Sequence, residues 1–116
     1  MAARQFQTIR EFYPYYLSEH RRPFTRLMHF SGTALLLACF VYAVFTQQWN
    51  LLFLVPVLGY GFAWVAHAFI EKNKPATFTY PLFSLQSDFI MFWHMLTGKI
   101  GEKMAEAERI YPGDRA

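Results

Sequence analysis

The feature that most constrains this chain is a run of 44 consecutive residues, 27–70, without a single Asp, Glu, Lys or Arg. A helix rises ~1.5 Å per residue, so about 20 residues cross a bilayer core of ~30 Å. The run therefore has room for two spans, which we predict at about 27–46 and 51–70. This predicts an all-α protein built on an integral membrane helical hairpin, with residues 1–116 in a single membrane-embedded domain.

The composition supports a membrane environment. Apolar residues make up 54% of the chain and charged residues 16%, against roughly a quarter charged in an ordinary soluble domain. The single cysteine, Cys39, excludes a disulfide framework and a Cys-based zinc site. The net charge of +3 comes without a basic stripe, which favours anionic lipid headgroups over nucleic acid as a partner.

The cations predict how the hairpin is oriented. Arg21, Arg22 and Arg26 precede the first span, and Lys72 and Lys74 follow the second. Positive residues concentrate in cytoplasmic segments, so we expect the open end of the hairpin to be cytoplasmic. The membrane would be the inner membrane of a bacterium or the endoplasmic reticulum of a eukaryote. A homodimer is compatible with this topology.

Amphipathic or partly inserted helices are expected on both sides of the hairpin. Residues 6–20 mix aromatic and charged side chains, which suits a piece at the headgroup level interrupted by Pro14 and Pro23. The third apolar segment, 82–98, is expected to lie in the interface or to insert without fully crossing. On a helix, its polar and small residues would share an arc of about 120°: Ser84, Ser87, Asp88, His94 and Gly98.

Two histidines in the predicted spans are expected to meet. His29 is the third residue of the first span, and His67 lies three residues before the end of the second. An antiparallel hairpin places both within about one helical turn of the same membrane face. Small residues such as Gly32 and Gly59 lie on the same faces and let the two helix backbones approach closely.

These histidines suggest a metal site. His67 and Glu71 share a face at i, i+4, so Glu71 can be a ligand or can orient the imidazole. His20 lies just before the first span, and Pro23 permits a turn back toward the site. Three imidazoles and a carboxylate without a thiolate suit Fe(II), Mn or Zn. We predict His20, His29 and His67 as the metal ligands and Glu71 as a further catalytic residue.

Other interpretations stay open at this point. Tyr16, Asp88 and His94 can support the metal site, but Tyr16 also suits an interfacial aromatic belt, and the other two suit the wet face of an interfacial helix. Facing histidines also ligate haem in membrane electron carriers. A non-enzymatic lipid-binding scaffold, in which the histidines only pack helices, is a third possibility.

Two sequence elements flank the hairpin: His20-x8-His29-x2-Gly32-Thr33 and His67-x3-Glu71-Lys72-x2-Pro75-Ala76. A third, Tyr80-Pro-Leu-Phe-Ser84-Leu-Gln-Ser-Asp88, follows them. In this order, and over about residues 16–99, the chain resembles the family of small membrane proteins that includes the 2-hydroxy fatty acid dioxygenase of the endoplasmic reticulum. It is shorter than the larger eukaryotic members and has fewer apparent spans.

The resemblance implies an Fe(II)-dependent oxygenase that uses O2 to shorten a 2-hydroxy fatty acid by one carbon, as in fatty acid alpha-oxidation. It implies that His20, His29 and His67 are required and that Glu71 matches the acidic position of the family. A 2-hydroxy acid can chelate iron through its hydroxyl and carboxylate. We expect a cationic side chain to hold that carboxylate, with three candidates: Arg21, Arg22 and Arg26.

Overall fold

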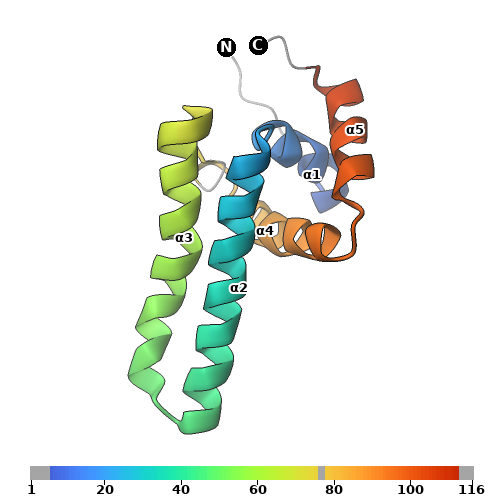
Figure 1. Ribbon diagram of the computed structural model, residues 1–116. Coiled ribbons are helices and arrows are strands. Elements are labelled where there is room, and N and C mark those ends of the chain that lie inside the picture. The colour runs from blue at the N-terminus through green and yellow to red at the C-terminus, as the bar shows by residue number, and fades with distance from the viewer. Residues whose placement is uncertain (1–5, 76–77, 113–116) are drawn as a thin grey trace. The chain divides into compact units, whose positions relative to one another are not determined.

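The computed structural model describes residues 6–75 and 78–112, which form helices joined by short connections and contain no strand. Ala76 of the second sequence element lies outside the described residues. Figure 1 labels the helices, and the bounds of all elements are α1 Ile9–Ser18, α2 Pro23–Thr46, η1 Trp49–Phe53, α3 Leu54–Ala66, η2 His67–Glu71, α4 Pro81–Leu96 and α5 Ile100–Ile110. The chain divides into two compact units, Met1–Arg21 with Ala76–Ala116 and Arg22–Pro75. The single domain over 1–116 stays a prediction.

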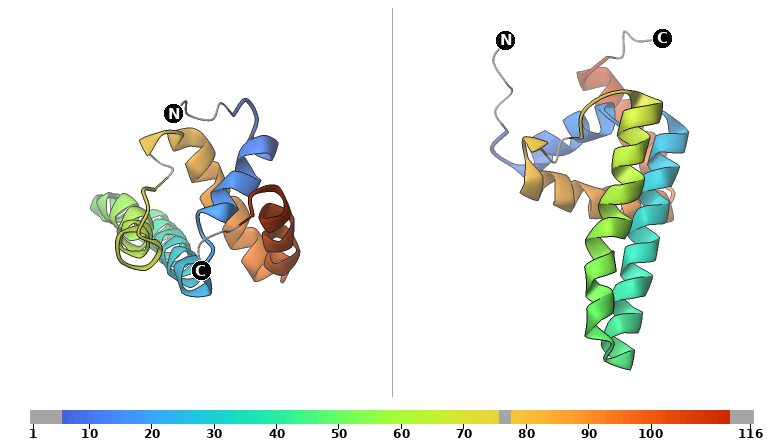
Figure 2. Two further views of the ribbon diagram at one scale, coloured as in Figure 1. Left: turned by 90° about the horizontal axis from the view of Figure 1, so that it is seen from above. Right: turned by 90° about the vertical axis from the view of Figure 1, so that its left-hand side faces the viewer.

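The unit Arg22–Pro75 is the predicted hairpin. Its helices α2 and α3 run side by side in opposite directions (Figures 1 and 2). The segments Pro23–Thr46 and Trp49–Glu71 are long and apolar enough to cross a membrane. The first helix begins at Pro23 rather than at residue 27, because the fixed φ of proline suits a first helical turn. It ends at Thr46, and the following Gln47, with a φ of 58°, turns the chain toward η1.

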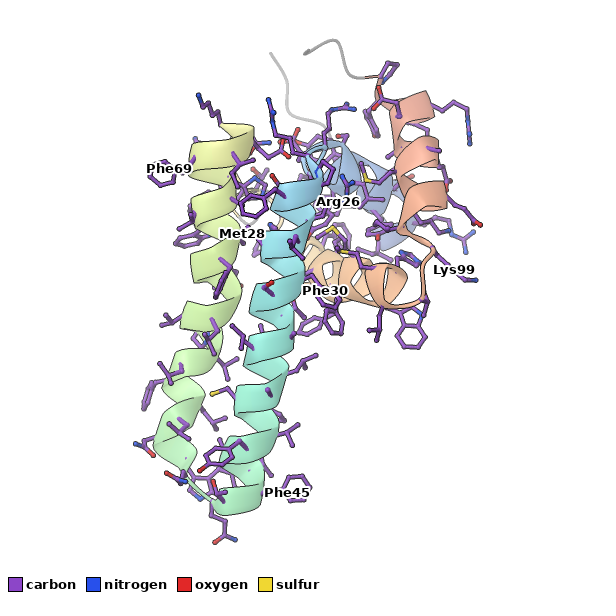
Figure 3. The ribbon with its side chains drawn as sticks, in the orientation of Figure 1. Arg26, Met28, Phe30, Phe45, Phe69 and Lys99 are labelled. Atoms are coloured by element: carbon purple, nitrogen blue, oxygen red, sulfur yellow. The ribbon has the colours of Figure 1, made fainter. Side chains whose placement is uncertain are left out.

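Glycines set the spacing of α2 and α3. A Cβ on Gly32 would lie 2.8 Å from the backbone oxygen of Leu58, and one on Gly59 would lie 2.8 Å from Leu36 Cδ2. The predicted close approach of the two helices is therefore confirmed. Large apolar side chains project from the rest of the hairpin: Phe45 is 83% exposed and Phe69 is 74% exposed (Figure 3). An exposed apolar surface of this extent is typical of a membrane or protein interaction site.

The other unit packs α1 against α4 and α5 around an aromatic core. Phe12, Tyr16 and Leu17 are at most 1% exposed. Of the two interpretations of Tyr16 left open by the sequence, an interfacial belt does not agree with this burial. The core is completed by residues from all three helices: Tyr13, Met91 and Ala107.

Two local predictions in this unit are wrong. Pro14 does not interrupt the helix but lies inside α1. An internal proline costs roughly 3 kcal/mol, and burial of the large side chains around it offsets this at about 1.5–3 kcal/mol each. Gly98 does not share the polar face of α4, because the helix ends at Leu96 and Gly98 adopts a φ of 77° beyond it. Ser84 and Ser87 do lie on that face and are buried.

Candidate metal centre

The hairpin brings His29 and His67 together. Their ring centroids lie 5.4 Å apart, with the rings at 88° to each other. Both side chains are buried, at 6% and 2% exposure. The prediction that two histidines of equal depth meet at the open end of the hairpin is confirmed.

A π-helical turn shapes the surroundings of His67. Residues His67–Glu71 form this turn, and Lys72 then adopts a left-handed φ of 59°. The backbone N–H groups of Lys72 and Asn73 both donate to the His67 carbonyl. Such turns are rare and occur frequently at functional sites. After this wider turn, the chain comes back toward His67, the residue at which the turn begins.

Asn73 orients the His67 ring. Nδ1 of His67 lies 2.6 Å from Oδ1 of Asn73. Because a carbonyl oxygen only accepts, Nδ1 is the donor, and Nε2 is the ring nitrogen that could ligate a metal ion. This is the arrangement of a metal-ligating histidine held by an outer hydrogen bond. Asn73 was not predicted from the sequence, where only a polar residue soon after the helix end marks its position.

Glu71 has a different partner from the one predicted. Its Oε2 accepts a hydrogen bond from the backbone N–H of Arg22 at 2.7 Å. Arg22 is the N-cap of α2 and offers no capping side chain, so the carboxylate of Glu71 binds at the positive end of that helix dipole. The orienting role expected of Glu71 belongs to Asn73, and Glu71 instead fastens the end of one hairpin helix to the start of the other.

His20 is held by Tyr16 in the unit that contains α1, α4 and α5. Nδ1 of His20 donates to the Tyr16 carbonyl at 2.6 Å, and the two rings stack with centroids 4.1 Å apart. The Tyr16 hydroxyl donates in turn to Asp88. Burial raises the pKa of Tyr16 well above its usual range, helped by the negative charge of Asp88 and the hydrogen bond to it. The tyrosine therefore stays protonated, and Nε2 is the ring nitrogen of His20, as of His67, that could ligate a metal ion.

His20, His29 and His67 are thus three buried histidines that can bind a metal ion. Neutral imidazoles suit transition metals such as zinc, copper, iron and nickel, so this donor set is compatible with a bound transition-metal ion.

Comparison with known proteins identifies the family of this chain. The family model described as 2-hydroxy-palmitic acid dioxygenase Mpo1-like matches residues 6–100. The chain belongs to this family. Membership suggests dioxygenase activity on a 2-hydroxy fatty acid. No curated protein and no solved structure shows a significant match to the chain.

The predicted arginines differ in what they contact in this Mpo1-like chain. Arg21 forms an ion pair with Glu108 and also donates to the Tyr111 carbonyl, so the structure ties its guanidinium to α5. Its predicted role in holding substrate stays a prediction. Arg22 is exposed, and Arg26 lies on α2 one turn before His29. Substrate binding by these two stays a prediction.

His94 belongs to a separate contact. Its Nδ1 lies 2.8 Å from the Tyr13 hydroxyl, and it is not among the three histidines grouped as metal ligands within the described residues. Partial burial, and then the positive charges of Lys103 and Lys99, lower the pKa of His94. The imidazole is therefore neutral near pH 7 and accepts the hydrogen bond from Tyr13.

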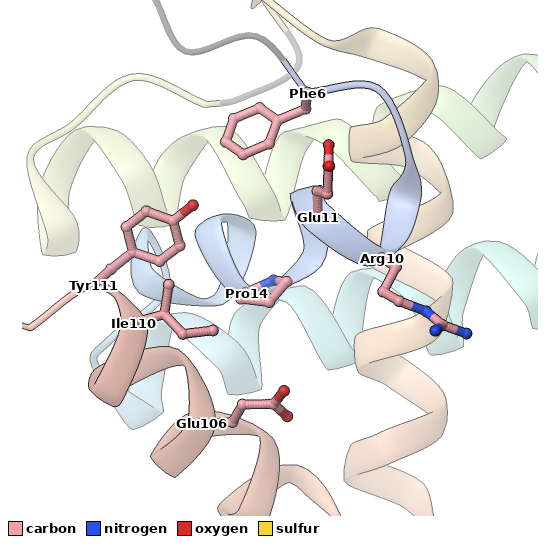
Figure 4. A pocket seen from close by; sticks show the side chains of 7 residues that line it. All are labelled: Phe6, Arg10, Glu11, Pro14, Glu106, Ile110 and Tyr111. Atoms are coloured by element: carbon pink, nitrogen blue, oxygen red, sulfur yellow. The ribbon is translucent and has the colours of Figure 1, made fainter.

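A surface cavity lies between α1 and α5 of this Mpo1-like chain, in the unit that also contains His94 (Figure 4). Its volume is about 400 Å³. None of the predicted site residues lines it, since its walls are Phe6, Arg10, Glu11, Pro14, Glu106, Ile110 and Tyr111. The candidate metal centre is thus distinct from this cavity.

Proposed function

We propose that this chain is a membrane-embedded Fe(II)-dependent dioxygenase that shortens 2-hydroxy fatty acids by one carbon. The observation that carries the proposal is the buried pair His29 and His67 at the open end of the hairpin, in a chain that belongs to the Mpo1-like family. With O2 as oxidant, the atoms balance when the hydroxy acid yields the shortened acid, CO2 and water.

The donor set supports Fe(II). His20 and His67 are each held through Nδ1 and therefore offer Nε2. Neutral imidazoles without thiolates suit Fe(II) better than a soft metal, and three such ligands leave positions open for substrate. A bound Fe(II) would supply a Lewis acid that a 2-hydroxy carboxylate can chelate and at which O2 can react.

Chain connectivity supports His20 as the third ligand. The backbone N–H of Arg22 is fixed on Glu71, one helical turn beyond His67. His20 precedes Arg22 by only two residues, so its Cα lies within ~7.6 Å of the Arg22 Cα. We infer that this short link delivers His20 to the end of the hairpin where His29 and His67 meet.

The buried hydroxyl of Thr25 supports a substrate whose oxygen atoms can form hydrogen bonds. Thr25 is fully buried, and its Oγ1 has no hydrogen-bond partner among the described residues. It precedes His29 by four residues and so shares its face of α2. We propose that Thr25 hydrogen-bonds an oxygen of the substrate, while Arg26 or Arg22 pairs with the carboxylate and the acyl chain stays in lipid.

Metal content and turnover test the proposal together. We expect detergent-purified wild-type protein to contain stoichiometric iron and to convert 2-hydroxypalmitate to the acid one carbon shorter. His29→Ala and His67→Ala should each lose both iron and turnover, whereas His94→Ala, outside the metal group, should keep iron. Unchanged iron and turnover in the first two variants would refute the site. A Soret band in the wild-type protein would instead support haem.

A further inference from the structure

The helix α4 buries small polar side chains and exposes large apolar ones. Ser84 and Ser87 are buried at 3% and 0% exposure, together with Met91. At 100° per residue, these three occupy an arc of about 60°. Asp88, next to this face, accepts from Tyr16. The helix therefore buries both of its serines, whereas Gln86, which lies beside the opposite face, is exposed.

The opposite face of α4 is apolar and exposed. We call it the α4 stripe; on the helical wheel its members fall within about 80°, centred opposite the buried serines. Exposure ranges from 75% at Leu82 to 38% at Phe89. The α4 stripe consists of Leu82, Leu85, Phe89, Trp93 and Leu96.

We propose that the α4 stripe is a membrane-binding surface, embedded in the interface of the bilayer that the hairpin crosses. The polar and apolar faces are arranged as in a helix that lies in the plane of a membrane. With 16 residues, α4 is ~24 Å long, which is too short to cross a bilayer core of ~30 Å. The predicted lipid-exposed hairpin of the same chain supplies the bilayer.

The ends of the stripe fit lipid better than a second protein. Trp93 on the stripe is 59% exposed, and tryptophan is enriched at the membrane–water interface. Lys99 projects from the turn that follows (Figure 3), and Lys103 lies one turn further on α5. Cations beside an apolar face are complementary to anionic headgroups.

Spin labels measure the environment of the α4 stripe directly. In a Cys39→Ser background, single labels are placed by Leu82→Cys and Phe89→Cys on the stripe. Ala105→Cys, on an exposed position of α5, serves as the matched control. The full chain is reconstituted in vesicles of phosphatidylcholine with a minor fraction of phosphatidylglycerol. These sites are already exposed, so the labels displace no core residue.

We expect the ratio of collisions with O2 to collisions with a water-soluble nickel chelate to be several-fold higher at residues 82 and 89 than at residue 105. Equal access to the chelate at all three sites would overturn the proposal. Low access to both reagents at 82 and 89 would also overturn it, because it would mean that protein, such as a second copy, covers the stripe.

Native Trp93 gives a second measurement without a label. In the variant Trp49→Phe/Trp64→Phe, Trp93 is the only tryptophan. Lipids brominated near the glycerol end of the acyl chain should quench its fluorescence more strongly than acrylamide in the water phase. Stronger quenching by acrylamide would contradict an embedded α4.

Discussion

The hydrogen bond between His67 and Asn73 is the detail that most directly tests the metal centre at residue scale. Removing an outer partner of a ligating histidine typically lowers metal affinity by about 10–100-fold. We therefore expect Asn73→Ala to bind iron that much more weakly, measured by competition with a chelator. Asn73→Asp keeps an oxygen acceptor at the same position and should restore most of the affinity. Equal affinity in all three proteins would exclude an orienting role for Asn73.

His94 provides a pH-dependent prediction. Burial and two lysines lower its pKa, so the unfolded protein binds more protons than the folded protein as the pH falls through the ordinary value of about 6.5. The stability contribution of neutral His94 is therefore complete above that pH and is lost below it. An NMR titration should place its midpoint below about 6.5.

Lys103→Gln should raise the His94 midpoint, because it removes the larger of the two lysine effects. Lys72→Gln, which alters a lysine not among these causes, serves as the control and should leave the midpoint unchanged. If the titration midpoint of His94 is the same in Lys103→Gln as in the wild type, the charge of this lysine does not act on the imidazole.

The residue-scale predictions succeeded where the distance of a residue from the helix ends decides the outcome. His29 and His67 could be paired from their distances to the ends of two spans, and their rings do meet. Asn73 could not be found this way, because the i, i+4 rule assumes an α-helix. The π-helical turn at His67 changes that spacing, and it turns Asn73 onto the ring while Glu71 reaches Arg22.

At the scale of elements, the packing of α2 on α3 depends on Gly32. A methyl group there would meet the Leu58 backbone oxygen at 2.8 Å and Phe62 Cβ at 3.1 Å. Backbone cannot yield as a flexible side chain does, so we expect Gly32→Ala to destabilise the hairpin by about 1–3 kcal/mol. Thermal unfolding in detergent measures this.

Gly61→Ala is the matched control for Gly32→Ala. Gly61 also lies in a hairpin helix, but a Cβ there meets nothing within 4 Å. This variant should unfold at or slightly above the wild-type temperature, since alanine favours helix by roughly 0.5–1 kcal/mol over glycine. A similar loss of stability in both variants would show that close packing at Gly32 is not the cause.

The flanking helices show the limit of predicting elements from local pattern. Pro14 was expected to interrupt residues 6–20, yet α1 continues through it because Phe12, Tyr16 and Leu17 are buried on its neighbours. The polar arc of α4 was predicted correctly for Ser84 and Ser87. Which side of that arc faces protein depends on tertiary contacts that no single segment reveals.

At the scale of the whole molecule, the charge-free run at 27–70 was sufficient to predict the hairpin and its all-α class. Where the spans end was less predictable, because Pro23 and the π-helical turn extend the helices into residues that carry charge. The membership of residues 6–100 in the Mpo1-like family then connects this architecture with oxidation of a 2-hydroxy fatty acid.

The orientation of the hairpin is a prediction for the whole molecule. The cations at the open end favour the cytoplasmic side, so the connection at Gln48 should face the opposite compartment. In a Cys39→Ser background, we expect Gln48→Cys to react with a membrane-impermeant maleimide on intact bacterial spheroplasts. Lys74→Cys, exposed at the open end, should react only after permeabilisation. The reverse pattern would place the metal centre on the outer face, where substrate and iron would have to arrive from outside the cell.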